Sequence, residues 1–244
     1  MYRSFLFLLF LFLVSPQPLF SAELTILTEN LPPLNYLRNG VLVGPSVEIV
    51  REIQKRVGSD EMIEVFPWAR AYQLALTEKN VVLFGTTHTK ERNELFKWVG
   101  PLATKRDILL AKKQEGIELQ SLEDAKKVQR IGTLRDDTRE RLLKEKGFTN
   151  LYSVSDEQNN AKKLMLGRID LWAYKKPGWR TVCELAGINP EEFVEVLDLR
   201  EIDVSIAFSK TTSDAIVNKW RNAFKEMLSD GTIDRIRAGS PNDQ

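Results

Sequence analysis

Arg92 is the residue of this 244-residue chain whose type and setting point most clearly to chemistry. A guanidinium carries a rigid fork of N–H donors that fits a carboxylate bidentately, and it stays charged at any physiological pH. Arg92 and Thr87 follow a β-branched run that predicts a strand, and Thr89 is placed to cap the helix that begins there. Ligands of open α/β sheets bind outside the carboxyl ends of the strands. We therefore predict that Arg92 binds an anionic group; the alternative is a surface arginine paired with Glu91 or Glu94.

The other reactive residue types exclude several kinds of site. His88 and Cys183 are the single histidine and the single cysteine, so they cannot furnish an ordinary His/Cys zinc site, and no intrachain disulfide can form. We expect Cys183 to be a small buried residue in a helix. No G-x-x-x-x-G-K, G-x-G-x-x-G or H-E-x-x-H motif occurs. The sequence therefore favours a binding module over an enzyme, with no cofactor and no metal.

The elements that must position these residues follow from hydrophobic periodicity. Ser46 is predicted to cap a helix that stops at Gly58, Ser155 and Gln158 form a capping box, and a long helix is predicted at about 214–229. Strands are predicted at 24–28, 62–66, 81–85, 108–111, 130–134, 170–174 and 204–209. Strict alternation of strand and helix favours mostly parallel sheets covered on both faces, so the predicted fold class is α/β.

The N-terminus predicts the compartment. Arg3 is followed by an apolar run of about ten residues and then by Pro16, which is typical of a secretory signal peptide, here residues 1–22. That run is shorter than the ~20 residues of a membrane span, and no later segment is apolar enough. Lys and Arg total 35 against 34 Asp and Glu, interspersed, so no clustered basic face is predicted for nucleic acid. We expect a periplasmic monomer that is not embedded in the membrane.

Several sequence blocks together carry a family resemblance. They are Thr28-Glu-Asn-Leu-Pro-Pro-Leu-Asn-Tyr36, Phe66-Pro-Trp-Ala-Arg-Ala71, Gly85-Thr-Thr-His-Thr-Lys-Glu-Arg92, Phe96-Lys-Trp-Val-Gly-Pro101, Ser121-Leu-Glu-Asp124, Arg130-Ile-Gly-Thr133 and Gly167-Arg-Ile-Asp-Leu171. In this order and spacing, nearly the whole mature chain resembles the family 3 bacterial extracellular solute-binding proteins, the polar-amino-acid type of periplasmic binding protein.

The resemblance implies a type II periplasmic binding fold. Two lobes, each a mostly parallel sheet flanked by helices, are joined by a two-strand hinge and close on a ligand in the cleft between them. We place lobe 1 at residues 23–107 plus 208–244 and lobe 2 at residues 108–207. The same resemblance makes Arg92 the carboxylate-binding arginine, with Thr87 as the matching hydroxyl.

The resemblance also indicates the walls of the cleft. Glu29, Tyr36, Trp68 and Arg70 lie in segments that resemble cleft-lining segments of the family. Glu29 could hold an amine. Trp68 either stacks on a planar or cationic ligand or packs into the core.

Lobe 2 should contribute the turn that opens the helix after residue 134. Thr138 is expected to face the cleft, whereas Asp137 is either an N-cap or a ligand contact. Tyr174 and Lys175 stand where amino-acid binders of the family usually carry an acidic residue for the ligand's α-ammonium. Lys175 would repel that ammonium and attract a second anionic group, unless it and Lys176 are solvated loop charges.

The leading interpretation is a solute-binding protein that captures a small polar, carboxylate-bearing metabolite, an amino acid or a related compound. It would deliver this solute to the permease of an ABC transporter or to a sensor kinase. Two alternatives stay open. One is a dehydratase on the same fold, acting on prephenate or arogenate, with Glu29 or Asp137 as the acid. The other is a degenerate sensing domain that no longer binds solute. His88 either lines the cleft or is an exposed loop residue.

Overall fold

The computed structural model describes residues 24–176 and 178–239, so the predicted signal peptide at residues 1–22 lies outside the described residues. No helix within these two ranges is long and apolar enough to cross a bilayer. In chain order the elements are β1 Thr25–Thr28, β2 Tyr36–Arg38, β3 Val41–Val43, α1 Pro45–Val57, β4 Ile63–Val65, α2 Trp68–Thr77, β5 Val81–His88, α3 Lys90–Asn93, β6 Phe96–Lys112, η1 Lys113–Glu115, α4 Leu122–Ala125, β7 Ile131–Leu134, α5 Thr138–Glu145, β8 Leu151–Val154, α6 Glu157–Met165, β9 Leu171–Lys176, α7 Trp179–Leu185, η2 Pro190–Glu192, β10 Phe193–Ser209, α8 Asp214–Ser229 and α9 Thr232–Gly239.

One sheet runs through both halves of the molecule. Its strand order is β4-β1-β5-β10-β6-β9-β7-β8, and β2 and β3 form a separate hairpin. β1 is parallel to β4 and β5, and β7 is parallel to β8 and β9. The antiparallel pairs of the sheet all involve β6 or β10. The parallel pairs at the two ends are the ones that the strand–helix alternation predicts.

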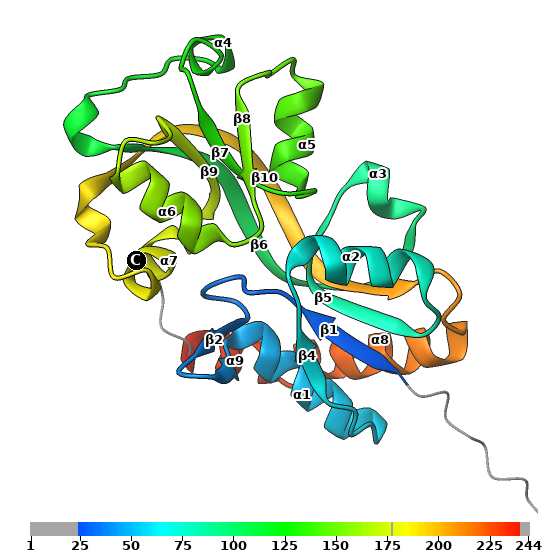
Figure 1. Ribbon diagram of the computed structural model, residues 1–244. Coiled ribbons are helices and arrows are strands. Elements are labelled where there is room, and N and C mark those ends of the chain that lie inside the picture. The colour runs from blue at the N-terminus through cyan, green and yellow to red at the C-terminus, as the bar shows by residue number, and fades with distance from the viewer. Residues whose placement is uncertain (1–23, 177, 240–244) are drawn as a thin grey trace, which may run out of the picture.

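The helices and the strands that they cover form two groups (Figure 1). We call them lobe 1, which contains β1–β5, α1–α3, α8 and α9, and lobe 2, which contains β7–β9 and α4–α7. In lobe 1, α1, α8 and α9 pack on one face of the sheet through residues such as Ile49 and Trp220, and α2 covers the other face through Tyr72. In lobe 2, Ile108 and Leu110 of β6 join the core beneath α6 and α7. Leu109 and Ala111 point to the opposite core beneath α5. Each lobe therefore has apolar layers on both faces of its strands.

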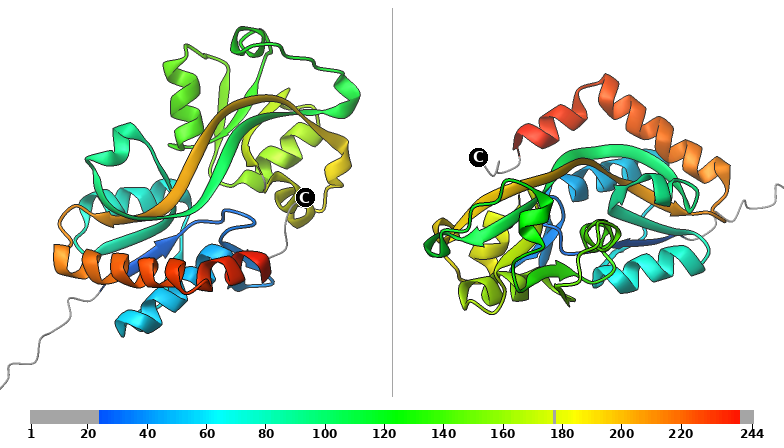
Figure 2. Two further views of the ribbon diagram at one scale, coloured as in Figure 1. Left: turned by 180° about the vertical axis from the view of Figure 1, so that it is seen from behind. Right: turned by 90° about the horizontal axis from the view of Figure 1, so that it is seen from above.

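The strands β6 and β10 connect the two lobes. Each is 17 residues long, and they pair antiparallel from Phe96 opposite Ser209 to Lys112 opposite Phe193. Figure 2 shows the two strands crossing together from one lobe to the other. The pairing register shifts between Val204 and Ile206 and at two further places in β10. The lobe boundaries predicted at residues 107 and 207 fall within these strands.

Helix starts differ from two predictions, while the long helix predicted at about 214–229 is confirmed as α8. The prediction that Ser46 caps α1 is wrong, because Gly44 is the N-cap, Pro45 takes the first helical position and Ser46 is buried in the first turn. Gly44 has φ 118°, and a Cβ there would lie 2.3 Å from the main-chain oxygen of Leu34, so a side chain is excluded. The cap of α6 is Asp156 rather than Ser155, because its carboxylate accepts from the main-chain N–H of Gln158 at 3.0 Å.

Candidate ligand-binding site

Arg92 lies in the short helix α3, directly after β5. Thr89 is the N-cap of α3 and accepts from the main-chain N–H of Arg92 at 3.3 Å, which confirms the predicted cap. The Arg92 side chain is 1 % exposed. Its guanidinium carbon lies 4.8 Å from the ring centroid of Trp68 and 4.5 Å from that of Tyr72. The prediction's alternative, an exposed surface arginine, is therefore wrong.

The guanidinium of Arg92 is buried and forms no ion pair with a described carboxylate. Nη1 donates to the main-chain oxygen of Thr87 at 3.3 Å, whereas Nε and Nη2 have no hydrogen-bond partner among the described residues. Burial lowers the pKa of Arg92 below its usual value, and Arg141 acts in the same direction, whereas Tyr72 and Asp137 oppose the change. Leaving a charged donor buried and unpaired is costly, and an anion that pairs with it recovers that cost. The geometry suits a carboxylate or another oxyanion at Nε and Nη2.

A buried ion network lies on the lobe 2 side of the site. Asp137 is the N-cap of α5, as predicted in one alternative, and its Oδ1 accepts from Arg139 Nε at 2.6 Å. Lys175 Nζ lies 3.6 Å from Asp137 Oδ2, and Arg139 Nη2 lies 2.9 Å from Glu157 Oε1. Burial alone would raise the pKa of Asp137, but Arg139 and Lys175 together lower it well below its usual range.

Lys175 is therefore paired with a side chain of the protein, Asp137. It is 2 % exposed, so its description as a solvated loop charge is wrong. Lys176 is half-exposed, and its Nζ pairs with Glu195 at 2.6 Å. Because Asp137 already has two cationic partners, this corner of the site offers no unpaired carboxylate for an added ammonium group.

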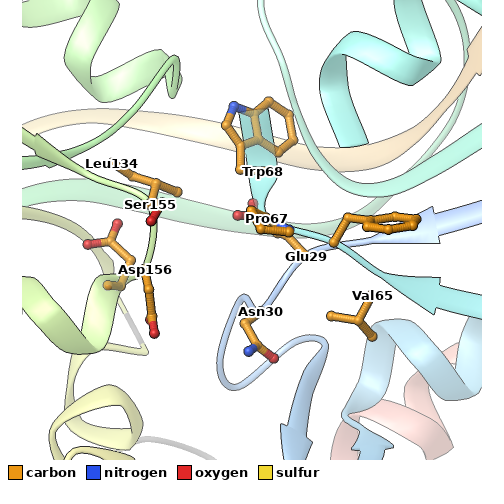
Figure 3. A pocket seen from close by; sticks show the side chains of 10 residues that line it. Glu29, Asn30, Val65, Pro67, Trp68, Leu134, Ser155 and Asp156 are labelled. Atoms are coloured by element: carbon orange, nitrogen blue, oxygen red, sulfur yellow. The ribbon is translucent and has the colours of Figure 1, made fainter. Parts of the chain in front are cut away.

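A cavity of about 150 Å³ lies between the lobes. Figure 3 shows Glu29, Asn30, Val65, Pro67 and Trp68 on its lobe 1 side and Leu134, Ser155 and Asp156 on its lobe 2 side. Glu29 is 3 % exposed, and no hydrogen bond or ion pair joins its carboxyl group to another described residue. Burial raises the pKa of Glu29 to about 8, although Lys175 opposes the change. At neutral pH Glu29 is therefore mostly protonated and can donate a hydrogen bond.

A second cavity, of about 160 Å³, is lined by Arg92, which does not line the first. Besides Arg92, its lining comprises Thr89, Glu91, Thr138, Arg141, Leu142, Glu145 and Arg200. Thr138 is 4 % exposed, and its hydroxyl oxygen has no hydrogen-bond partner in the described part of the chain. Arg200 is already paired, because its Nε donates to Asp107 Oδ2 at 2.9 Å and its Nη2 to the main-chain oxygen of Thr138 at 3.2 Å.

The lobes are in direct contact around these cavities. Trp68 Nε1, at the start of α2 in lobe 1, donates to the main-chain oxygen of Asp136 in lobe 2 at 3.0 Å. A Cβ added to Gly178, before α7, would lie 2.3 Å from the main-chain oxygen of Pro32 in lobe 1. This close approach describes a closed arrangement of the two lobes.

Three predicted site residues line neither cavity. Tyr36 is buried in the β2–β3 hairpin, where Arg38 donates to its hydroxyl. Arg70 is exposed and stacks on Phe66, with 4.3 Å from its guanidinium carbon to the ring centroid. Tyr174 is buried beneath the guanidinium of Arg139, 5.0 Å from the ring centroid. Tyr174 therefore supports the ion network and does not line either cavity.

The single histidine and cysteine stand outside the site. His88 stacks on Trp98 with ring centroids 4.1 Å apart and lines neither cavity. Cys183 is buried in α7, as predicted, and burial raises the pKa of its thiol to about 12. Within residues 24–176 and 178–239, no cluster of His, Cys, Asp and Glu could hold a metal ion.

Sequence reasoning missed several residues that shape the site. Tyr72 carries a signal that could have been found, since it lies four positions after Trp68 on the same face of a helix. Glu157 carries none, because an acidic residue in the first turn of a helix ordinarily only complements the helix dipole. Arg141 likewise reads as a solvated helix position, since it is exposed.

Two α/β lobes that meet around a partly polar site define a ligand-binding protein of the two-lobed type. Residues 24–239 match the family described as bacterial extracellular solute-binding proteins, family 3. This chain belongs to that family. No curated protein matches the chain.

Solved structures confirm the fold. An ancestral arginine-binding protein bound to arginine is 22 % identical with a TM-score of 0.79, covering 90 % of this chain and 98 % of its own. An amino acid ABC transporter substrate-binding protein from Streptococcus pneumoniae bound to L-arginine is 18 % identical with a TM-score of 0.74, covering 87 % and 92 %. A histidine kinase sensor domain with similarity to periplasmic binding proteins is 18 % identical with a TM-score of 0.79, covering 88 % and 95 %.

Proposed function

We propose that this chain is a periplasmic protein that binds a small carboxylate-bearing metabolite between its two lobes. The observation that carries the proposal is the Arg92 guanidinium, which is 1 % exposed, lies against Trp68 and Tyr72, and has two N–H donors without a partner among the described residues. A carboxylate that accepts from both donors satisfies them and neutralises the buried charge. Thr87 contributes its main-chain oxygen to hold the guanidinium in place.

The division into lobes supports capture by closure. We propose lobe 1 at residues 23–107 plus 208–244 and lobe 2 at residues 108–207. Separate apolar cores support this division, since the clusters around Trp220 and Tyr72 belong mainly to the first set of residues and those around Trp172 and Leu143 to the second. Closure would bury Arg92 and Thr138, which line the same cavity, around the solute.

The destination of the solute is also a proposal. The family's extracellular character and the predicted signal peptide at residues 1–22 support a periplasmic monomer. Likenesses to a substrate-binding protein of an ABC transporter and to the sensor domain of a histidine kinase support delivery to either kind of membrane partner. Both roles require the same capture step.

An enzyme is the second candidate, because one observation favours it. Glu29 is buried in the cavity between the lobes with its pKa raised to about 8, as a general acid requires. A dehydratase would release product from prephenate or arogenate, and Glu29→Gln would abolish that release. Saturable binding without product supports the solute-binding protein instead.

Thermal unfolding of residues 23–244 against a panel of amino acids, dicarboxylates and aromatic acids tests the main proposal. A ligand at 100 times its Kd adds about 2.7 kcal/mol. This raises the midpoint by about 5 to 10 °C for a protein of this size. Arg92→Ala is expected to remove the shift. Arg51→Ala is the matched control, because Arg51 is an exposed arginine of α1 and lines neither cavity.

The panel is run again after unfolding and refolding, which strips any ligand retained from expression. If Arg92→Ala keeps its full response, Arg92 does not bind the carboxylate. If refolded wild-type protein responds to no compound of the panel, the proposed carboxylate-binding function is wrong and the degenerate sensing domain becomes the better description.

A further inference from the structure

Two arginines from opposite lobes meet on one tyrosine ring. The guanidinium carbon of Arg92, in lobe 1, lies 4.5 Å from the ring centroid of Tyr72. The guanidinium carbon of Arg141, on α5 of lobe 2, lies 5.4 Å from the same centroid. Arg92 and Arg141 both line the second cavity, together with Thr138. The contact therefore exists only when the lobes are together.

Neither of these guanidinium groups has an anionic partner. No ion pair joins Arg92 or Arg141 to any carboxylate in the described ranges, whereas Arg200, the third arginine of the cavity, is paired with Asp107. Glu91 and Glu145 line the same cavity, but both are exposed and neither forms an ion pair with a described residue. Bringing these two guanidinium groups together with no carboxylate paired to either opposes closure of the lobes.

Hydrogen-bond donors in the second cavity are arranged to receive the same ligand. Arg92 keeps two unpartnered N–H donors and Thr138 an unpartnered hydroxyl, and all three are buried. Thr138 is also the first residue of α5, so the main-chain N–H groups at the start of this helix add positive potential beside the cavity. Donors and positive charge thus converge from both lobes.

We propose that Arg141 is a second ligand-binding cation, which with Arg92 receives an oxyanion group carrying two negative charges or a pair of carboxylates. This inference rests on the proposed carboxylate-binding function and adds the ligand's charge to it. The bound group lies between the two guanidinium groups and converts their repulsion into an attraction that holds the lobes together. The sequence suggested Lys175 for a second anion, but Lys175 is engaged by Asp137.

Ligands that differ in charge test this assignment. Thermal unfolding is measured with succinate and with succinamate, its half-amide, with glutamate and glutamine, and with inorganic phosphate, all at constant ionic strength in chloride. Wild-type protein is expected to bind the more highly charged member of a pair at least about tenfold more tightly, which corresponds to 1.4 kcal/mol. Arg141→Gln should remove most of that preference and leave the affinity for the less charged member within about twofold.

A charge control and a folding control accompany the variant. Lys146→Gln removes one positive charge from an exposed position just after α5 and should keep the wild-type preference. Circular dichroism without ligand checks that Arg141→Gln folds; Arg141→Lys, which keeps the charge, should retain part of the preference for the dianion.

The outcomes separate this inference from the function on which it rests. If carboxylates bind, Arg92→Ala abolishes their binding and Arg141→Gln leaves the charge preference intact, Arg141 is not a ligand residue and only the present inference is overturned. If wild-type protein prefers succinamate over succinate or glutamine over glutamate, the assignment of a dianionic ligand is overturned, while the proposed carboxylate-binding function stands. If no carboxylate binds, the proposed function itself has failed.

Discussion

Asp137 shows how one residue can hold several parts of the site at once. Its carboxylate caps α5, pairs with Arg139 at 2.6 Å and lies 3.6 Å from Lys175. All three side chains are at most 2 % exposed. Removing one partner from a buried ion pair leaves an uncompensated charge, which costs more than the pair contributes.

Asp137→Asn is therefore expected to lower the free energy of unfolding by about 3 to 5 kcal/mol. Asparagine still caps the helix, so the loss reports the charge rather than the cap. Adding Lys175→Met to Asp137→Asn should recover part of the loss, because it removes a buried cation without a partner. Urea unfolding of the wild type, both single variants and the double variant measures these changes in the free energy of unfolding. If the losses in the two single variants simply add up to the loss in the double variant, Asp137 and Lys175 are not coupled.

Glu29 makes stability depend on pH in a defined direction. Its pKa rises from the ordinary 4.5 to about 8 on folding, so between these values the folded state binds more protons than the unfolded state. Stability from this group is fully present below about pH 4.5 and is lost as pH rises through about 8, at up to about 1.4 kcal/mol per pH unit.

Relative to the wild type, Glu29→Gln should therefore gain stability from about pH 5 to about pH 8, and the difference should be constant above that. Chemical unfolding across this range measures the difference. Glu64→Gln, at an exposed position of β4, is the control. If the free energies of unfolding of the wild type and Glu29→Gln change with pH in the same way, Glu29 does not titrate in this window.

The sequence indicated the position of Arg92 but not its surroundings. Its place after a strand and the cap at Thr89 follow from local residue types, whereas the lack of partners at Nε and Nη2 depends on how Trp68 and Tyr72 pack around it. The role of Lys175 was misjudged for the same reason, since only the tertiary structure brings it to Asp137.

At the scale of elements, the strands that join the lobes were predicted far too short. The runs predicted at 108–111 and 204–209 are apolar, but β6 and β10 continue for 17 residues each. Their middle parts carry charged residues such as Arg106 and Asp198, which pair with each other at 2.9 Å. These side chains conceal the strand pattern because both strands are partly exposed where they cross between the lobes. The short hairpin β2–β3 and strand β8 were missed as well.

Helix α2 connects the lobes through its first residue. Trp68→Phe keeps an aromatic ring beside Arg92 but removes the Nε1 donor to Asp136, a bond of 3.0 Å between the lobes. One such hydrogen bond contributes about 0.5 to 1.5 kcal/mol, so the affinity for the carboxylate found in the panel should fall about two- to tenfold.

Isothermal titration calorimetry measures this change, and Trp98→Phe is the control. Trp98 Nε1 donates to the main-chain oxygen of Asn93 at 3.4 Å, which is a bond within lobe 1. Equal losses of affinity in the two variants would show that the bond between the lobes has no special part in binding.

At the scale of the whole molecule, closure depends on a position without a side chain. Gly178 of lobe 2 approaches the main-chain oxygen of Pro32 so closely that a Cβ would lie 2.3 Å from it. Gly178→Ala should hold the lobes apart. We expect a larger radius of gyration by small-angle scattering with ligand present. We also expect ligand binding to be at least about tenfold weaker, which corresponds to 1.4 kcal/mol.

The matched control is Gly187→Ala. Gly187 also has a positive φ, 72°, but no atom lies within 4 Å of its added Cβ. This variant should be destabilised by backbone strain while keeping its ligand affinity. If Gly178→Ala binds as tightly as the wild type, the contact with Pro32 does not limit closure.

The place of β10 in the sheet has a consequence for the order in which the protein can be completed. β10 lies between β5 and β6, yet it follows all of lobe 2 along the chain. The strands β4, β1 and β5 are neighbours, and so are β6, β9, β7 and β8, so each group can assemble before β10 is present. β5 and β6 stay unjoined until β10 arrives. In a chain still emerging from a ribosome or a membrane pore, the strands of the two lobes can therefore form separately, but one continuous sheet joins them only when β10 is added.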